Sequence, residues 1–386
     1  MKRIYLDYAA TSPLDPEAAK AMRPYLQKKY GNPSSIYEEG REGRRAVDRA
    51  RAGIADFIGA KPEEIIFTSG GTESNNTAVK GVAFARRKKG NHIITSAIEH
   101  HAVTEQEKFL KEQGFEMTFV PVDKHGLVDP GDVKKAISPA TILISVMHAN
   151  NEIGTIQPVE EIGKIAREHE VYFHTDAVQT FGHIPVNVDS LNADLVSASA
   201  HKLSGPKGIG MLYVRKGTRI SPLLHGGDQE RNRRAGTENT AGIAGFAKAV
   251  EIAGEAMEEE AKRLTAMRDG LLKKLFSKMD DIYLNGHPKK RLPNNINVSV
   301  AFVEGESMII NLDMEGISVS TGSACTSSTL EASHVLRALG MDPALAHGSI
   351  RITTGRFTTK EDMDALAKML PPIVRKLRKM SPLYKK

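Results

Sequence analysis

The residues best suited to chemistry begin with a lysine in the middle of the chain. Lys202 follows a short apolar run that starts at Leu195, and the chain then turns at Gly205-Pro206. Such a run is typical of a buried strand, so Lys202 is expected at a strand end, beside the imidazole of His201. An amine that is partly desolvated in such a place can lose its proton and attack a carbonyl. Taken alone, the stretch fits a solvated surface lysine equally well.

A glycine turn nearer the N-terminus is a candidate anion site. Ser69-Gly70-Gly71-Thr72 follows the apolar run at 65–67 and precedes a helical pattern. Strand, glycine turn and helix start, in that order, leave free N–H groups and the positive end of the helix dipole facing a ligand. The turn matches neither the nucleoside-triphosphate P-loop nor the dinucleotide fingerprint. The sequence therefore predicts an anion cradle of another kind.

Two histidines and two amides follow other apolar runs. His100 and His101 lack the spaced cysteine or histidine partners of a zinc site, so we expect an imidazole that stacks on a flat ligand or shuttles protons. His101 is explained equally well as an inert loop residue. Asn150 and Asn151 follow the most apolar run, where unpaired amides are costly to bury, so we expect them to meet a polar ligand. For Asn150, a simple turn residue is the preferred interpretation.

A carboxylate and an amide complete this set. Asp176 lies at the end of a buried apolar run and needs a positive or proton-donating partner, such as a protonated heterocyclic nitrogen. Gln179 would then donate to a neighbouring ring oxygen. The alternative is that Asp176 caps a helix beginning at Ala177. Together, an anion cradle, a stacking imidazole, a buried carboxylate and an activated lysine describe a pyridoxal-phosphate site.

The chain has one cysteine, Cys325, within Gly322-Ser323-Ala324-Cys325. A free cysteine is more often a buried apolar residue than a reagent. Here the small and polar neighbours indicate a mobile surface loop. An exposed thiol with a pKa near about 8.5 keeps some thiolate at neutral pH. We therefore expect Cys325 to be a reagent, and sulfur to be what is moved.

An arginine near the C-terminus suits the carboxylate of an amino-acid substrate. Arg356 follows a short strand pattern, and its planar guanidinium can bind a carboxylate through two hydrogen bonds. Arg351 is the competing candidate. It alternates with Ile350 and Ile352, which would put it on the opposite face of the strand. The sequence analysis favours Arg356.

These side chains need a scaffold in which strands and helices alternate. Apolar runs at 65–67, 92–95, 117–120, 142–147 and 171–173 are separated by amphipathic stretches, one of which begins after Pro158. Near-continuous apolar strands of this kind predict an α/β fold with a mostly parallel sheet covered on both faces. In such sheets ligands collect beyond the carboxyl ends of the strands. A long helical pattern from about 241 to 278 then connects to a smaller α/β region.

Composition restricts the remaining options. The 386 residues are 40% hydrophobic and 26% charged, which is ordinary for a globular protein of two domains. The net charge of +6 comes from scattered basic residues without interleaved aromatic ones, so we expect no nucleic-acid partner. We also expect no membrane association, because no apolar stretch is long enough. The single cysteine excludes a disulfide framework and fits a reducing cytoplasm.

The chain resembles the cysteine desulfurases, class-V aminotransferases of pyridoxal-phosphate fold type I. The resemblance is strongest to the branch that serves iron–sulfur cluster assembly or nitrogenase maturation. Its motifs are Tyr5-Leu6-Asp7, Gly31-Asn32-Pro33-Ser34-Ser35, His201-Lys202 with Gly205-Pro206-Lys207-Gly208, the cysteine loop, and Gly355-Arg356-Phe357-Thr358-Thr359. It implies an aspartate aminotransferase-like fold. A large domain (15–262) would hold a mostly parallel seven-stranded sheet flanked by helices, and a smaller α/β domain (1–14 and 263–386) would carry Cys325.

The resemblance also implies residue roles. Lys202 would hold pyridoxal 5'-phosphate covalently and later move the Cα proton, assisted by His100 stacked on the ring. Cys325 would attack the sulfur of L-cysteine, become a persulfide while alanine leaves, and transiently contact a nascent iron–sulfur cluster. The implied cofactor-binding residues are Gly71, Thr72, His100, Asn151, Asp176, Gln179, Ser199, His201, Lys202 and Thr237. Asn151 and Arg356 would bind the substrate.

Partners follow from the same resemblance. Thr237 matches a position that reaches the phosphate of a neighbouring subunit, which implies a homodimer. An iron–sulfur scaffold protein or another sulfur acceptor would receive the sulfur. A transaminase and a selenocysteine lyase remain alternatives within the fold, and a non-catalytic sulfur carrier is an alternative from another class. Intact Lys202, Asp176 and His100 argue against the carrier.

Overall fold

A seven-stranded sheet forms the larger part of the molecule. The computed structural model describes residues 3–321, 332–382 and 384. The strands of the main sheet are β2 (Ile65–Thr68), β3 (His92–Ser96), β4 (Glu116–Val120), β5 (Thr141–Ser145), β6 (Tyr172–Asp176), β7 (Leu195–Ser199) and β8 (Gly210–Val214). Their order is β2-β8-β7-β6-β5-β3-β4, and β8 alone runs antiparallel to its neighbours. The predicted mostly parallel seven-stranded sheet is confirmed.

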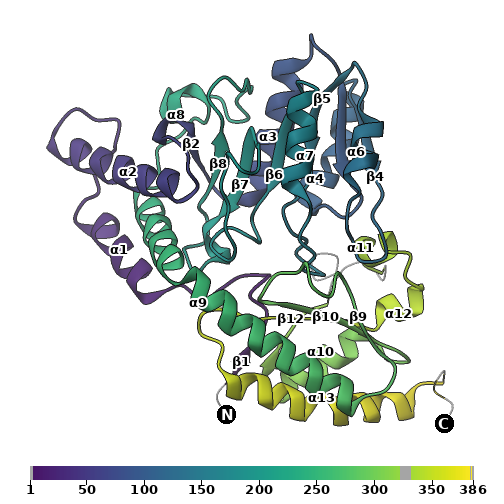
Figure 1. Cartoon of the computed structure of the whole chain (residues 1–386). Helices are drawn as coiled ribbons and strands as arrows, with labels where there is room; N and C mark the ends of the chain where they lie inside the picture. Colours follow the sequence, from purple (N-terminus) through teal and green to yellow (C-terminus); the bar gives the residue numbers. More distant parts are fainter. Residues whose placement is uncertain (1–2, 322–331, 383, 385–386) are drawn as a thin grey trace.

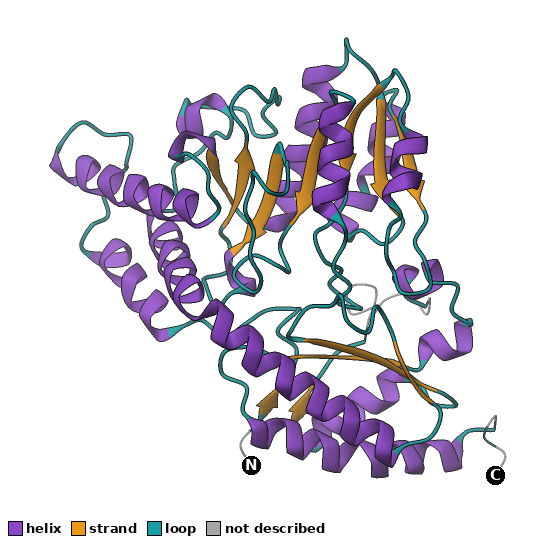
Figure 2. Ribbon diagram, viewed as in Figure 1, coloured by secondary structure: helices purple, strands orange, loops and turns teal. Residues whose placement is uncertain are grey.

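Helices cover both faces of this sheet (Figure 2). Ile65 and Phe67 belong to a core cluster that also includes apolar residues of α2 (Glu38–Phe57), α6 (Pro130–Ala136) and α7 (Val159–Glu168). Ile66, between them, belongs to a second cluster on the other face, with residues of α3 (Gly71–Arg86). Successive strand residues thus point to opposite, equally buried faces, which is why the strands are apolar without alternation.

A second, smaller sheet lies beyond the carboxyl ends of the main one. β12 (Ser349–Thr353), β10 (Asn295–Val300) and β9 (Ile282–Leu284) pair in that order, all antiparallel. Helices α10 (Gly305–Met314) and α13 (Lys360–Met380) cover one face, and the loops of the main sheet lie toward the other (Figure 1). β1 (Ile4–Tyr5) pairs in parallel with β11 (Ile317–Ser318) beside this region.

One long helix joins the two parts. α9 (Thr240–Lys278) contributes Ile243 and Phe246 to the first core cluster of the main sheet, and Leu271 and Leu275 to the cluster beneath the small sheet. It confirms the long helical connector expected from the sequence. The expected boundary between residues 262 and 263 falls inside this helix and stays a prediction.

The remaining elements are short or peripheral. They are α1 (Pro16–Gln27), η1 (Pro62–Glu64), α4 (His101–Thr104), α5 (Gln106–Glu112), η2 (Ala200–Lys202), α8 (Gln229–Asn232), α11 (His334–Ala338) and α12 (Pro343–His347). None of the helices in the described part of the chain combines the length and apolar character needed to cross a membrane.

Candidate active site

The carboxyl ends of the main strands and the inner face of the small sheet enclose a cavity of about 320 Å³. Nine of the ten predicted cofactor-binding residues line it. They are Gly71, Thr72, His100, Asn151, Asp176, Gln179, Ser199, His201 and Lys202. Thr237 is not among the described residues around this cavity. The sequence motifs, which are spread over some 130 positions, therefore meet at one place, as parallel strand ends should.

Lys202 is the last residue of the short turn that follows β7. Its Nζ donates hydrogen bonds to the carbonyl oxygens of Ala9 (2.5 Å) and Ala10 (2.7 Å) from the N-terminal segment. The turn is tight, because a Cβ at Gly205 would lie only 2.8 Å from the carbonyl oxygen of Ala200. Glycine is therefore required at position 205, where the chain leaves the turn. The tight turn places Lys202 in the cavity wall.

Asp176 ends β6 and is buried, with 5% of its surface exposed. Its Oδ2 accepts a hydrogen bond from Nδ2 of Asn75 (2.6 Å), and its Oδ1 accepts one from the backbone N–H of Val178 (2.9 Å). Residues 177–180 form a turn and not a helix, so the helix-cap alternative is wrong. Both described partners are neutral, so the carboxylate can still stabilise a protonated ring nitrogen facing it.

His100 precedes α4, and its Nδ1 accepts a hydrogen bond from the backbone N–H of Ala102 (3.0 Å). Burial lowers the pKa of His100, the charge of Asp176 opposes this, and the charge of Lys202 lowers the pKa further. The imidazole is therefore neutral at neutral pH and carries its proton on Nε2. A neutral ring of this kind can stack on a flat ligand and accept a proton.

The predicted anion cradle lies at the first turn of α3, a helix of 16 residues. Gly70 has a φ of 154°, and a Cβ at Gly71 would lie 2.7 Å from Cγ2 of Val178. Position 70 favours glycine because of its backbone conformation, and position 71 favours glycine because a Cβ has no room there. His201 lines the same cavity as Gly71 and Thr72 of this turn. Its burial and the charges of Lys202 and Lys207 lower the pKa of His201 to about 4.

These groups fit pyridoxal phosphate. The cradle offers backbone N–H groups at a helix N-terminus for the phosphate. The neutral environment of the Asp176 carboxylate leaves room for one positive partner, as a protonated pyridine nitrogen would be. Lys202 and His100 complete the requirement, and all of them share one cavity.

The two candidate arginines occupy different places. Arg351 is 4% exposed and lines the cavity with Lys202. It donates to Oδ1 of Asp7 (2.9 Å) and to the carbonyl oxygen of Asn151 (3.1 Å). Its Nε is buried without a hydrogen-bond partner among the described residues, and such a donor points to a missing acceptor.

Arg356 lies in a neighbouring cavity of about 50 Å³, and its Nε is 3.1 Å from Oδ2 of Asp15. The alternation argument correctly put Arg351 on the face opposite Ile350 and Ile352, which are both fully buried in the small-sheet core. That opposite face looks into the cavity, so Arg351 competes with Arg356 for a substrate carboxylate, and the choice of Arg356 stays a prediction.

Two other residues near the cavity were not recognised from the sequence. Asn75 orients the Asp176 carboxylate, but a buried amide on a helix gives no distinct sequence signal. Glu99 is fully buried beside His100, and its Oε1 accepts hydrogen bonds from Oγ of Ser96 (2.6 Å) and the N–H of Met147 (2.9 Å). Burial raises the pKa of Glu99 to about 8, opposed by those two hydrogen bonds. Only its neighbour His100 drew attention.

Cys325 lies outside the described residues, but both ends of its segment can be located. Before it, Ser320 pairs with Arg351 through two backbone hydrogen bonds (3.1 and 2.6 Å). After it, Oγ of Ser333 donates to Oε2 of Glu152 (2.5 Å), next to Asn151. His334 follows, with its Nε2 at 2.9 Å from the carbonyl oxygen of Glu99. The described residues before the segment therefore bond Arg351 of the cavity wall, and those after it bond Glu152 and Glu99, each one position from a wall residue.

Comparison with known proteins agrees with this geometry. The model of the family described as aminotransferase class V matches residues 4–366. "Cysteine desulfurase IscS" of Dictyoglomus turgidum is 61% identical over 383 residues, which are 99% of this chain and 97% of that protein. The protein of the same name from Methanosarcina thermophila is 55% identical over 100% of this chain and 95% of its own.

Solved structures give the same result. A structure described as a NifS-like protein superposes with a TM-score of 0.92 at 40% identity, covering 97% of this chain and all of that one. The apo structure of a cysteine desulfurase from Thermococcus onnurineus superposes with a TM-score of 0.87 at 28% identity, covering 97% and 95%.

Proposed function

The chain belongs to the class-V aminotransferase family and is a pyridoxal-phosphate-dependent cysteine desulfurase, and from this premise we propose which residues act and where the sulfur goes. One observation carries the proposal. Lys202, Asp176, His100 and Arg351 line a single cavity, and the residues flanking the segment that bears Cys325 bond Arg351 on one side and Glu152, next to the lining residue Asn151, on the other. The thiol and the amine, 123 positions apart in sequence, can then serve one substrate.

The cofactor residues divide by the part of the cofactor that each would hold. Pyridoxal phosphate, when bound, withdraws electrons from the substrate's Cα and so labilises the bonds around it. Lys202 holds it covalently and carries the Cα proton. Asp176 keeps the ring nitrogen protonated, and Gln179 donates to the phenolic oxygen. Gly71, Thr72, Ser199 and His201 hold the phosphate. His100, neutral at neutral pH, stacks on the ring and accepts or returns a proton.

Cys325 receives the sulfur. Its thiolate attacks Sγ of the substrate, the new S–S bond forms as the substrate's Cβ–Sγ bond breaks, and protonation of the remaining carbon gives L-alanine. L-cysteine and one thiol thus become L-alanine and one persulfide, so the step balances without an external oxidant. The persulfide then passes its outer sulfur to an acceptor. We propose an iron–sulfur scaffold as that acceptor, with Cys325 near the nascent cluster.

Arg351 binds the substrate carboxylate, with Asn151 beside it. Its buried Nε lacks a partner among the described residues, and Arg351 shares the cavity with Lys202. The sequence analysis favoured Arg356, whose guanidinium instead pairs with Asp15. Arg351 is itself paired with Asp7 (2.9 Å), so the buried Nε without a described partner, and not the absence of an ion pair, is what favours it.

The enzyme acts as a homodimer in the cytoplasm. Large apolar side chains are exposed along α1 and the loop after it, namely Leu26 (64%), Tyr30 (76%), Ile36 (88%) and Tyr37 (56%). Such a patch is typical of a protein interface. Thr237 is exposed and lies outside its own chain's cavity, which supports a contact with the partner's phosphate. A single working thiol fits a reducing compartment.

A direct assay tests the function. The purified protein is incubated with L-cysteine and a reductant, and sulfide and alanine are measured together, with equimolar release expected. Cys325→Ala should abolish both while the visible absorbance of the bound cofactor persists. Sulfide release by that variant would exclude the persulfide route, and pyruvate in place of alanine would exclude the desulfurase reaction.

A further inference from the structure

The segment from Asp228 to Asn239, called here the 228–239 segment, has an unusual backbone. Glu230, Arg231 and Asn232 have φ values of 45°, 57° and 61°. This left-handed region is unfavourable for residues with a Cβ, and three such residues in succession are rare. A backbone of this kind persists only where the surrounding structure holds it in place.

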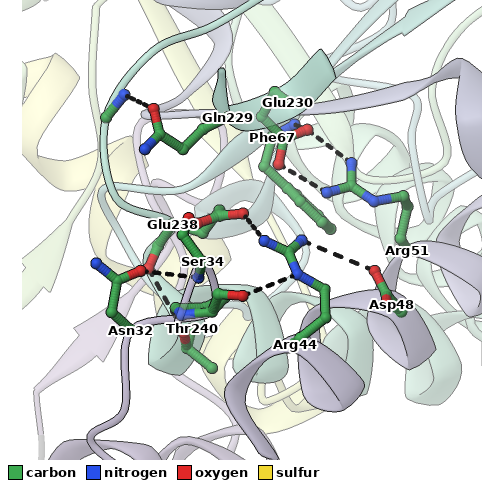
Figure 3. Close-up of polar contacts among 12 residues, drawn as sticks. Asn32, Ser34, Arg44, Asp48, Arg51, Phe67, Gln229, Glu230, Glu238 and Thr240 are labelled. Carbon is green, nitrogen blue, oxygen red and sulfur yellow. Dashed lines mark hydrogen bonds and ion pairs between the residues drawn. The ribbon is translucent and has the colours of Figure 1, made fainter. Parts of the chain in front are cut away.

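Glu230 anchors the first half of the segment. Its carboxylate accepts two hydrogen bonds from the guanidinium of Arg51 on α2 (2.6 and 2.7 Å) and one from the backbone N–H of Phe67 on β2 (3.1 Å). The side chains of Arg51 and Glu230 are 4% and 2% exposed. Figure 3 shows the pair above the Phe67 ring, whose centroid lies 4.7 Å from the guanidinium carbon. A buried bidentate pair fixes position strongly.

Glu238 anchors the second half. Its Oε1 accepts a hydrogen bond from Arg44 of α2 (2.5 Å; Figure 3). The same guanidinium donates from Nε to the carbonyl oxygen of Pro33 (3.2 Å). Oε1 of Gln229, just before the first anchor, accepts a hydrogen bond from the N–H of Gly236 (3.0 Å) and closes the loop. Thr237 is exposed between Gly236 and the buried Glu238.

Arg234 connects the segment to this chain's own phosphate cradle. It donates two hydrogen bonds to Glu73 (2.9 and 3.3 Å), and Oε2 of Glu73 accepts one from the N–H of Ser69, in the cradle turn. Burial acts to raise the pKa of Glu73, but the bonds from Arg234 and Ser69 outweigh it and lower that pKa. Glu73 is thus an anion in the first turn of α3, where it would repel a phosphate unless Arg234 neutralised it.

We propose that Arg51–Glu230, Arg44–Glu238 and Arg234–Glu73 act as positioning pairs, which hold Thr237 toward the partner's cofactor phosphate and join that contact to this chain's own cradle. The inference rests on the homodimer of the proposed function. Arg234 of the segment bonds Glu73 beside this chain's own phosphate cradle, while Thr237 contacts the phosphate in the other subunit. Each cofactor site therefore depends on the positioning pairs of both chains.

The first test measures cofactor affinity. Apoenzyme is titrated with pyridoxal phosphate by visible absorbance, and each variant's dimer mass and thermal unfolding are recorded. Arg234→Gln should weaken binding about tenfold, the cost of losing a charge-assisted pair near an anion, with dimer mass unchanged. The control is Arg45→Gln, because Arg45 forms an exposed pair with Glu38 (2.7 Å) within α2, the helix that carries Arg44 and Arg51. Glu238→Gln serves as the second variant, should Arg234→Gln not fold.

The second test separates action on the partner from action within the chain. Mixed dimers combine an unaltered subunit with one that carries Lys202→Ala, so covalent cofactor and its absorbance belong to the unaltered subunit. Adding Arg234→Gln to the Lys202→Ala subunit should weaken cofactor retention in the unaltered one. Unchanged retention there, or wild-type affinity in the homodimeric Arg234→Gln variant, would overturn the inference.

Failure of the inference is distinguishable from failure of the proposed function. Sulfide and alanine release by the wild type tests the activity without reference to these pairs. A wild-type protein that desulfurates cysteine as a monomer would overturn both the homodimer and this inference, while the activity would stand.

Discussion

The two walls of the active-site cavity are built in different ways. On the main-sheet wall, Asp176 and His100 each accept a hydrogen bond from an N–H two residues ahead. Distant residues contribute there too, since Asp176 also bonds Asn75 and Lys202 bonds the carbonyl oxygens of Ala9 and Ala10. On the small-sheet wall, Arg351 is fixed by Asp7 and Asn151, which are 344 and 200 positions away. Local hydrogen bonds therefore help to orient Asp176 and His100, whereas the contacts described for Lys202 and Arg351 come from long-range packing.

The largest effect is expected from the main-sheet wall. Lys202→Ala removes both the covalent hold on the cofactor and the group that moves the Cα proton. Loss of a proton-transfer group alone costs about 10²- to 10⁴-fold in rate, so sulfide release should fall at least about 10³-fold. Single-turnover sulfide assays at saturating cofactor measure it. If the variant kept a tenth of the wild-type rate, Lys202 would not be the residue that holds the cofactor and moves the Cα proton.

The small-sheet wall is tested by a pair of conservative changes. Arg351→Lys keeps the charge but loses the planar fork, so KM for L-cysteine should rise and kcat/KM should fall about 10²-fold, as expected for a buried charged hydrogen bond. Arg356→Lys is the matched control and should change kcat/KM by less than about threefold.

The opposite ranking of these two variants would return the carboxylate role to Arg356. It would also place the substrate carboxylate toward the smaller cavity, which Lys202 lines together with Arg356. Equal and small effects would show that neither arginine holds the carboxylate.

The same contrast explains what the sequence could and could not predict. Helix α7 after Pro158, the apolar strands and the residues at their carboxyl ends were predictable, because each depends on local pattern and on the rule that parallel strands end together. The position of Arg351 on the cavity wall was not predicted, because a strand pattern shows which residues share a face, not which face the helices α10 and α13 will cover. Asn75 and Glu99 were missed because burial of a polar side chain is decided by tertiary packing.

A moderate effect is expected at Asn75, because Asp176 is held both by this distant residue and by its near neighbour Val178. Asn75→Ala removes the longer-range of the two hydrogen bonds to Asp176 and leaves the local one from Val178. Cofactor affinity should fall about tenfold, the value of one hydrogen bond to a charged group. Asn91→Ala is the control, because this amide donates to Gly114 away from the cavity. If Asn75→Ala bound the cofactor as tightly as the wild type, the hydrogen bond from Val178 would be enough to hold Asp176 in place.

The last effect concerns stability in place of activity and adds to the account of the main-sheet wall. The pKa of Glu99 is raised by burial to about 8, from 4.5. The folded protein therefore keeps this proton between those two values while the unfolded chain loses it, so this group lowers the unfolding free energy as pH rises, by about 1.4 kcal/mol per pH unit. Glu99→Gln keeps an acceptor for Ser96 and Met147 but cannot ionise. The unfolding temperature of this variant, relative to the wild type, should consequently increase from pH 5 to pH 8. A constant difference across that range would mean that Glu99 is ionised in the folded protein and that a cation reaches it.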